Sequence, residues 1–177
     1  MYVWIGLNVS EFLPKFTSER KRLYDSLGFN NNLCSLPLHI SLKMSFDINE
    51  EICDEVIDLI TEYAKNLNPM IITPKKIENN NGICWIIMEE NKILNRIHND
   101  LNSMLLNKYN VPLHEYDCDF LFHTTLFMHE DIELVNKAYL EIKDLDLPKE
   151  LIPEEILVGV SADGSIGSYE IVRRIFI

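Results

Sequence analysis

Two short stretches of the chain match each other: Leu38-His39-Ile40-Ser41-Leu42 and Phe122-His123-Thr124-Thr125-Leu126. Each places a histidine and a hydroxyl residue two positions apart within an alternating apolar pattern typical of a β-strand. Residues i and i+2 of a strand point to the same face, so each imidazole should stand beside a hydroxyl group. The opposite face is apolar in the first stretch and carries one polar residue, Thr124, in the second. Both pairs are therefore predicted to face away from the hydrophobic core.

The two stretches open similar units. His123 stands 84 residues after His39, and each histidine is followed by a predicted strand, a capped helix and a hairpin. The distance from His39 to Gly82 in the first hairpin turn is 43 residues, and from His123 to Gly164 in the second it is 41. Repeated supersecondary units of this kind predict a duplicated architecture.

The expected fold class is α+β, as a bilobal pseudo-twofold duplication with repeat units at about 37–89 and 121–177. Two mainly antiparallel sheets should line a central cleft, with helices on the outer faces. We expect a single two-lobed domain over residues 1–177. Periodicity, caps and turn residues place the elements. Strands are predicted at 2–9, 37–46, 70–78, 83–89, 120–128, 155–162 and 168–177, and helices at 14–28, after Asn49, at 91–108 and after Asp131.

A pair of imidazoles facing one cleft suits cleavage of a phosphodiester. In-line displacement at phosphorus needs a base on the incoming oxygen and an acid on the leaving oxygen, on opposite sides of the phosphorus. Imidazole can serve as either near neutral pH. A neighbouring hydroxyl can donate to the non-bridging oxygens, where negative charge accumulates. The pattern requires no metal, and it does not say which histidine is the base.

The paired motifs, their spacing and the closing segments 156–161 and 169–172 resemble the 2H phosphoesterase superfamily. That superfamily includes bacterial RNA 2',3'-cyclic phosphodiesterases, which are named 2'-5' RNA ligases. The resemblance covers most of the chain and implies a bilobal α+β fold with metal-independent phosphoesterase chemistry. By motif position it makes His39 and His123 the catalytic pair, and Ser41 and Thr125 the hydroxyls that orient the phosphate. Ser41 stands where the superfamily usually has threonine.

Some other residues are weaker site candidates. Lys43 is in phase with His39 and Ser41, so its charge is either near the phosphate or solvated at the strand end. Three aromatic residues are candidates for stacking a base, although packing at a sheet edge is the commoner fate of such side chains: Tyr2, Trp4 and Trp85.

The other histidines and arginines are assigned less directly. His129 shares the phase of His123 near the end of its strand, whereas His98 and His114 are interpreted as surface residues. Arg173 and Arg174 are adjacent and should face opposite ways, so that one of them reaches the cleft. No metal site and no cofactor are predicted.

Composition restricts the partners. The 177 residues contain 16 Lys and Arg against 28 Asp and Glu, a formal net charge of −12. Gripping long nucleic acid requires clustered cations, so we expect a small nucleotide or an RNA-end phosphate as substrate. The four cysteines form no Cys-x-x-Cys pair, and neither a signal peptide nor a membrane span is evident. We therefore expect reduced thiols in a cytoplasmic protein, which we expect to be a monomer.

The resulting hypothesis is a metal-independent phosphodiesterase that opens a 2',3'-cyclic phosphate or a related nucleotide phosphodiester. One alternative keeps the chemistry and changes the substrate, as a cyclic di- or oligonucleotide hydrolase or a 2'-5' RNA ligase. Another is a non-catalytic nucleotide-binding module, against which two intact proton-transfer groups argue. The sequence does not identify the physiological substrate or the phosphate isomer produced.

Overall fold

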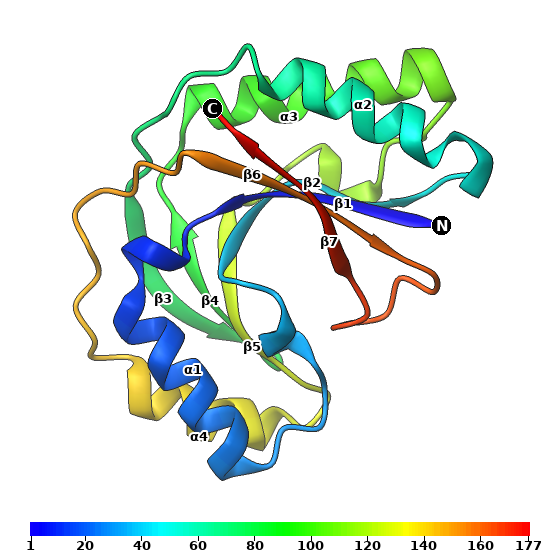
Figure 1. Cartoon of the computed structure of the whole chain (residues 1–177). Coiled ribbons are helices and arrows are strands. Elements are labelled where there is room, and N and C mark those ends of the chain that lie inside the picture. Colours follow the sequence, from blue (N-terminus) through cyan, green and yellow to red (C-terminus); the bar gives the residue numbers. More distant parts are fainter.

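The computed structural model describes all residues, 1–177, as two antiparallel sheets with helices outside them (Figure 1). The four-stranded sheet has the order β2-β1-β6-β7, and the three-stranded sheet has the order β3-β4-β5. The strands of the first are β2 (His39–Asp47), β1 (Tyr2–Asn8), β6 (Glu155–Ser161) and β7 (Glu170–Phe176). Those of the second are β3 (Pro74–Asn80), β4 (Ile83–Met88) and β5 (His123–Met128). The predicted α+β class with two sheets is confirmed.

Four α-helices cover the outer faces: α1 (Pro14–Leu27), α2 (Cys53–Ala64), α3 (Lys92–Tyr109) and α4 (Ile132–Ile142). Figure 1 shows α2 and α3 over the four-stranded sheet, and α1 and α4 together at the opposite end of the molecule. Asn91 and Asp131 accept hydrogen bonds from the first-turn N–H groups of α3 and α4, as N-cap side chains do. Gly28 ends α1 at φ 78°, a left-handed conformation that glycine adopts without steric cost.

The duplication begins one strand earlier than the sequence predicts. The segments β1–α1–β2–α2–β3 and β4–α3–β5–α4–β6 correspond, because β2-β1-β6 in one sheet matches β5-β4-β3 in the other. The third strand of each segment has crossed into the sheet of the other, so the halves are interlocked. β7 has no counterpart and extends the four-stranded sheet by one edge strand.

The hydrophobic core lies mainly between the sheets and their helices. On β1 the core-facing side chains are Val3, Ile5 and Leu7, each at most 1% exposed. Complete burial of such a side chain contributes roughly 1.5–3 kcal/mol. Four further apolar side chains are buried but lie outside this core: Trp4, Leu36, Ile87 and Leu157.

Three of these four lie on the inner sides of the sheets. Leu157 pairs across the strands with Gly6, and Ile87 pairs with His123. Trp4 pairs with Gly159. The space between the two sheets is therefore partly apolar.

No α-helix is long and apolar enough to cross a bilayer. The four cysteines are free thiols, with Cys53 and Cys84 buried and Cys34 and Cys118 exposed.

Candidate active site

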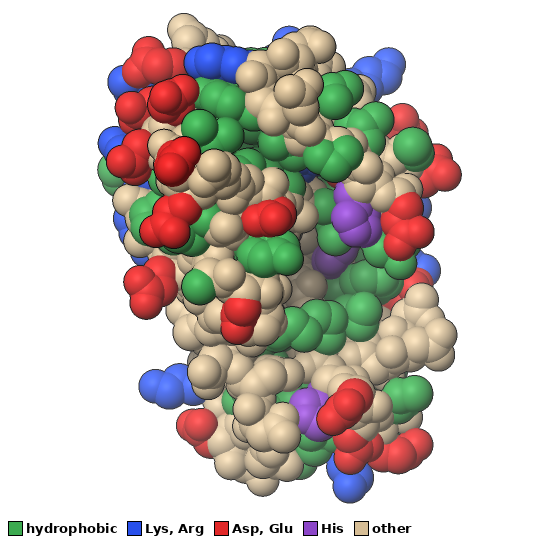
Figure 2. Space-filling view, turned by 90° about the vertical axis from the view of Figure 1, so that its right-hand side faces the viewer, with side chains coloured by type: hydrophobic (Ala, Val, Ile, Leu, Met, Phe, Trp, Pro, Cys, Tyr) green, Lys and Arg blue, Asp and Glu red, His purple; other side chains and the backbone are tan.

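The two sheets meet along β2 and β5, and each of these strands begins with a motif histidine. His39 is the first residue of β2 and His123 is the first residue of β5. The charge of His123 is the smallest of the causes that lower the pKa of His39. Figure 2 shows that the face on the right-hand side of Figure 1 is hollowed, with histidine and hydrophobic side chains near the hollow. Because β2 and β5 are in contact, both histidines lie where the two sheets meet.

Both imidazoles are held by the same local hydrogen bond. The Nδ1 of His39 is 2.8 Å from the carbonyl oxygen of Pro37, and the Nδ1 of His123 is 2.7 Å from that of Leu121. A carbonyl oxygen only accepts, so in each ring Nδ1 carries a proton and donates it. The neutral ring then has an unprotonated Nε2. Nε2 is therefore the atom of each histidine that can take up or release a proton at a substrate.

Burial in this partly apolar space favours the neutral form of both rings. For His39, burial is the main cause that lowers the pKa to about 4, and the charges of Arg20 and His123 lower it further. The hydrogen bond to Pro37 acts in the opposite direction. Burial also lowers the pKa of His123, against the hydrogen bond to Leu121. Both rings are accordingly uncharged at neutral pH in the free protein.

Trp4 on β1 organises the first motif. Its ring meets the His39 ring edge-on, with centroids 4.2 Å apart, and its Nε1 donates a 3.1 Å hydrogen bond to the Oγ of Ser41. The indole lies over Gly6 and Gly159, where a Cβ would come within 2.4 Å and 3.0 Å of ring atoms. These two positions have room for the indole only because they are glycines.

Trp85 on β4 lies beside the second motif, although its strand register makes it equivalent to Gly6 and not to Trp4, because Gly6 pairs with Ser41. Its ring centroid is 4.6 Å from that of His123, and it pairs across the strands with Thr125. Unlike the Nε1 of Trp4, the buried Nε1 of Trp85 has no hydrogen-bond acceptor. The structure thus places a tryptophan, a histidine and a hydroxyl residue together in each half.

The prediction for Lys43 is wrong. Its side chain is buried, and its Nζ forms a 2.8 Å ion pair with Asp117, which is also buried. The register of β2 against β1 shifts between Ser41 and Lys43, because β2 has an additional residue there. Such a bulge reverses the side-chain alternation, so Lys43 is no longer in phase with His39 and Ser41.

His98 is buried, contrary to the interpretation as a surface residue. Its Nδ1 is 2.8 Å from the carbonyl oxygen of Leu42 at the bulge, and its Nε2 is 3.1 Å from the carbonyl oxygen of Asp117. The same Asp117 accepts a hydrogen bond from the backbone N–H of His114. Burial alone would raise the pKa of Asp117, but hydrogen bonds from Lys43 and His114 and the charge of Lys43 lower it. This buried group ties β2 to the segment that leads into β5.

The aromatic candidates behave differently from one another. Trp4 is only 6% exposed, packed on two glycines and edge-on to His39, so it has no free face on which a base could stack. Of the two roles that the sequence leaves open for Trp4, the structure shows packing and no free stacking surface. Tyr2, which lies over Gly164, and Trp85 are half-buried.

The remaining candidates lie apart from the two motifs. The Nε2 of His129 is hydrogen-bonded to Asn30 at 2.8 Å, in the loop after α1. Arg173 lies 3.7 Å from Asp58 of α2, on the helix side of the sheet, whereas Arg174 lies on the opposite side. No three His, Cys, Asp or Glu side chains converge in a way that could hold a metal ion.

Comparison with known proteins finds structural matches to the fold but no match by sequence. No family model and no curated protein sequence matches the chain. Among solved structures, a phosphoesterase matches at TM-score 0.60 with 12% identity, covering 99% of this chain and 97% of the other. TT0787 of Thermus thermophilus matches at TM-score 0.55 and 16% identity, with coverage of 99% and 97%. E. coli LigT complexed with 3'-AMP matches at TM-score 0.59 and 12% identity, with coverage of 99% and 96%. The chain therefore has the fold of these proteins over its full length.

Proposed function

We propose that this chain, which has the LigT-like fold, is a metal-independent 2H-type phosphodiesterase that opens a nucleoside 2',3'-cyclic phosphate or a related nucleotide phosphodiester. The observation that carries the proposal is the matched orientation of His39 and His123. In each, Nδ1 is fixed by a backbone carbonyl oxygen two residues earlier, which leaves Nε2 free. Two such rings at neighbouring strands provide one acid and one base for the same phosphorus.

In the proposed reaction, the Nε2 of one histidine removes a proton from water as the water oxygen attacks the phosphorus. The bond between phosphorus and one ribose oxygen breaks, and the protonated Nε2 of the other histidine gives its proton to that oxygen. The product is a phosphomonoester, and the proton from water remains on the base. The hydroxyls of Ser41 and Thr125 stand beside the two rings and stabilise the charge that develops on the non-bridging oxygens.

The hydrogen bond from Trp4 gives Ser41 a defined role in this reaction. Because the Oγ of Ser41 accepts from the indole N–H, its own proton is free to be donated elsewhere. A phosphate oxygen beside His39 is the acceptor that the reaction provides. Trp4 is therefore a positioning residue, which acts through Ser41 and His39.

The substrate class rests on two further observations. LigT has been crystallised with 3'-AMP, ATP, NADP+ and phosphate. The acidic surface of the present chain, with its net charge of −12, favours a small nucleotide or a strand end over long nucleic acid. Hydrolysis of a cyclic di- or oligonucleotide and 2'-5' end joining would use the same two histidines.

The direct test is a substrate panel with purified protein in the presence of a chelator. It should contain the four nucleoside 2',3'-cyclic phosphates, a cyclic dinucleotide and a 2'-5'-linked dinucleotide. Phosphorus NMR of the products would show which ribose oxygen leaves. We expect turnover of at least one 2',3'-cyclic phosphate. Nucleotide binding without turnover of any member would instead support a binding module.

A further inference from the structure

The inner face of the four-stranded sheet continues from His39 to the far edge strand. Cross-strand partners lie side by side on one face of a sheet. Asn8 is the partner of His39, and Phe176 of β7 is the partner of Glu155 of β6. A 2.7 Å hydrogen bond from the Nδ2 of Asn8 to the Oε2 of Glu155 joins the two pairs. These four side chains form a row that crosses all four strands.

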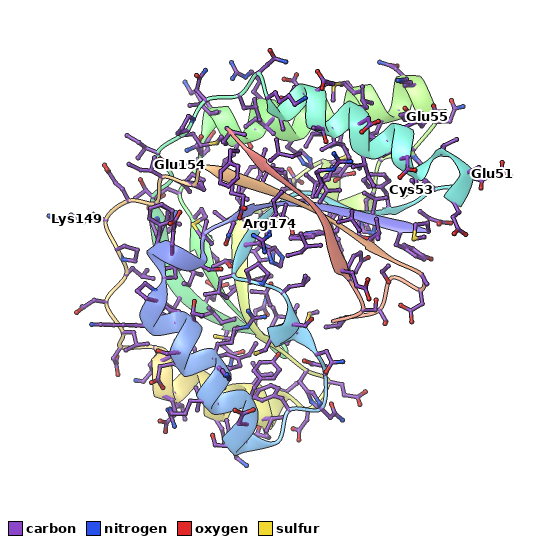
Figure 3. All side chains as sticks on the ribbon, in the orientation of Figure 1. Glu51, Cys53, Glu55, Lys149, Glu154 and Arg174 are labelled. Atoms are coloured by element: carbon purple, nitrogen blue, oxygen red, sulfur yellow. The ribbon has the colours of Figure 1, made fainter.

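Arg174 is held on this row. Its Nη1 donates a 2.9 Å hydrogen bond to the Oε2 of Glu155, the same oxygen that accepts from Asn8. Figure 3 shows Arg174 on the side of β7 that faces away from α2 and α3. A guanidinium group has five N–H donors in a planar fork, so a single bond to Glu155 fixes its position and leaves other donors free. The side chain is 51% exposed.

Phe176 stands two residues after Arg174 and therefore on the same face of β7. It is 76% exposed, the highest value among the large exposed apolar side chains. An exposed aromatic ring beside a held guanidinium group offers a stacking surface next to an anion-binding group.

The distance between His39 and Arg174 determines which ligand could contact both residues. Strands lie about 4.8 Å apart, so β6 is about 10 Å and β7 about 14 Å from β2, which carries His39. The guanidinium group of Arg174 is over β6, because it contacts Glu155. A mononucleotide whose cyclic phosphate lies between the histidines has no second phosphate to place there. A substrate with one more nucleotide has both a second phosphate and a second base.

We propose that Arg174 and Phe176 form a subsite for the nucleotide next to the scissile phosphate. Arg174 binds its phosphate, Phe176 stacks its base, and Glu155 and Asn8 position Arg174. This inference rests on the proposed function and narrows its substrate class to chains of at least two nucleotides. Arg173 takes no part, because it points to the helix side and lies beside Asp58.

The test compares adenosine 2',3'-cyclic phosphate with the ApA dinucleotide that ends in a 2',3'-cyclic phosphate. For the natural protein we expect kcat/KM to be at least about 10-fold higher for the dinucleotide, because a hydrogen bond between charged groups contributes at least about this factor. Arg174→Ala should remove this preference and leave kcat/KM for the mononucleotide unchanged. Arg173→Ala, its matched neighbour, should keep the preference. Phe176→Ala should reduce the preference only when the additional nucleotide carries a base.

Equal kcat/KM values for the two substrates in the natural protein, or a preference that survives Arg174→Ala, would overturn the subsite but not the phosphodiesterase. Binding of ApA with a terminal 3'-phosphate, measured by calorimetry, tests the subsite independently of turnover. Arg174→Ala should weaken that binding about 10-fold relative to Arg173→Ala. If neither substrate is hydrolysed and this difference is still found, the proposed function fails and the subsite stands. Identical affinities of the two variants would overturn the subsite.

Discussion

The Nε1 of Trp4 donates a 3.1 Å hydrogen bond to the Oγ of Ser41, and the same indole meets the ring of His39 edge-on. One side chain on β1 thus contacts both functional groups of the motif on β2. A single neutral hydrogen bond contributes about 1 kcal/mol to stability. The more important effect of this hydrogen bond is on orientation, because it determines where the hydroxyl proton of Ser41 can point.

Trp4→Phe keeps an aromatic ring against His39 and removes the N–H donor. We expect kcat to fall about 10-fold, with KM changed less, because the oxygens of the transition state lose an oriented donor. The Ser41→Ala variant should lose a similar factor, and the double variant should lose little more. Steady-state kinetics of the four proteins measures this coupling. Fully additive losses would show that Trp4 and Ser41 act separately.

Trp85→Phe, at the tryptophan beside the second motif, is the control for this cycle. The Nε1 of Trp85 has no hydrogen-bond acceptor, so removing it should change kcat less than Trp4→Phe does. A larger effect at Trp85 would indicate that its N–H group contacts the substrate.

Gly6→Ala tests the packing beneath the indole. The added Cβ would lie 2.4 Å from the Cζ2 of Trp4, so the ring must move, and Ser41 and His39 lose their contacts with it. We expect kcat/KM to fall at least about 10-fold and the protein to lose about 1–3 kcal/mol of stability, as for other overpacked sites. Gly28→Ala strains a left-handed position with no atoms nearby, so it should lower stability and leave kcat/KM unchanged. Equal kinetic effects of the two variants would argue against a role for the indole.

The pH dependence of kcat/KM follows from the two histidines. The base must be deprotonated, so the rate rises with pH through its pKa, and the acid must be protonated, so the rate falls through the other pKa. Burial lowers both values, that of His39 to about 4 and that of His123 below its usual 6.5. We therefore expect a bell-shaped profile with its maximum between about pH 4 and 6.5, whichever ring is the base. A maximum above pH 7 would contradict the free-protein pKa values.

We predict that the buried Lys43–Asp117 ion pair affects the free energy of unfolding and not catalysis. Asp117→Asn leaves the ammonium group of Lys43 buried without a charged partner, which should cost about 3–5 kcal/mol. The double variant Lys43→Met/Asp117→Leu should recover much of this loss, because a well-packed apolar pair replaces a buried ion pair. Urea denaturation measures both. If Lys43→Met instead raised KM at unchanged stability, the phosphate-binding role predicted from the sequence would be restored.

Periodicity and capping residues were sufficient to predict most of the fold. Asn91, Asp131 and Gly28 end or begin helices where the sequence predicts, because their side-chain chemistry acts locally. The two histidines were predicted as a pair because alternation along each strand fixes their face. The prediction failed at Lys43, where a bulge after Ser41 reverses that alternation.

Bulges and long-range partners are not visible in a local pattern. His98 satisfies the carbonyl group of Leu42 at the bulge, and Asp117 neutralises Lys43, yet both lie far from β2 in the sequence. The sequence leaves open whether Trp4 packs within the sheet or stacks a base, because its burial depends on Gly6 and on Gly159 of another strand. Each of these features depends on a contact that only the packed structure defines.

The central claim is that His39 and His123 transfer protons in one displacement at a single phosphorus. The measurement that tests it most directly is kcat/KM of the natural protein, His39→Ala, His123→Ala and the double variant on the best cyclic phosphate substrate. A positioned acid or base contributes about 10²–10⁴-fold, so each single variant should lose at least about 100-fold while retaining its fold by circular dichroism. Full activity in either correctly folded single variant would contradict the claim.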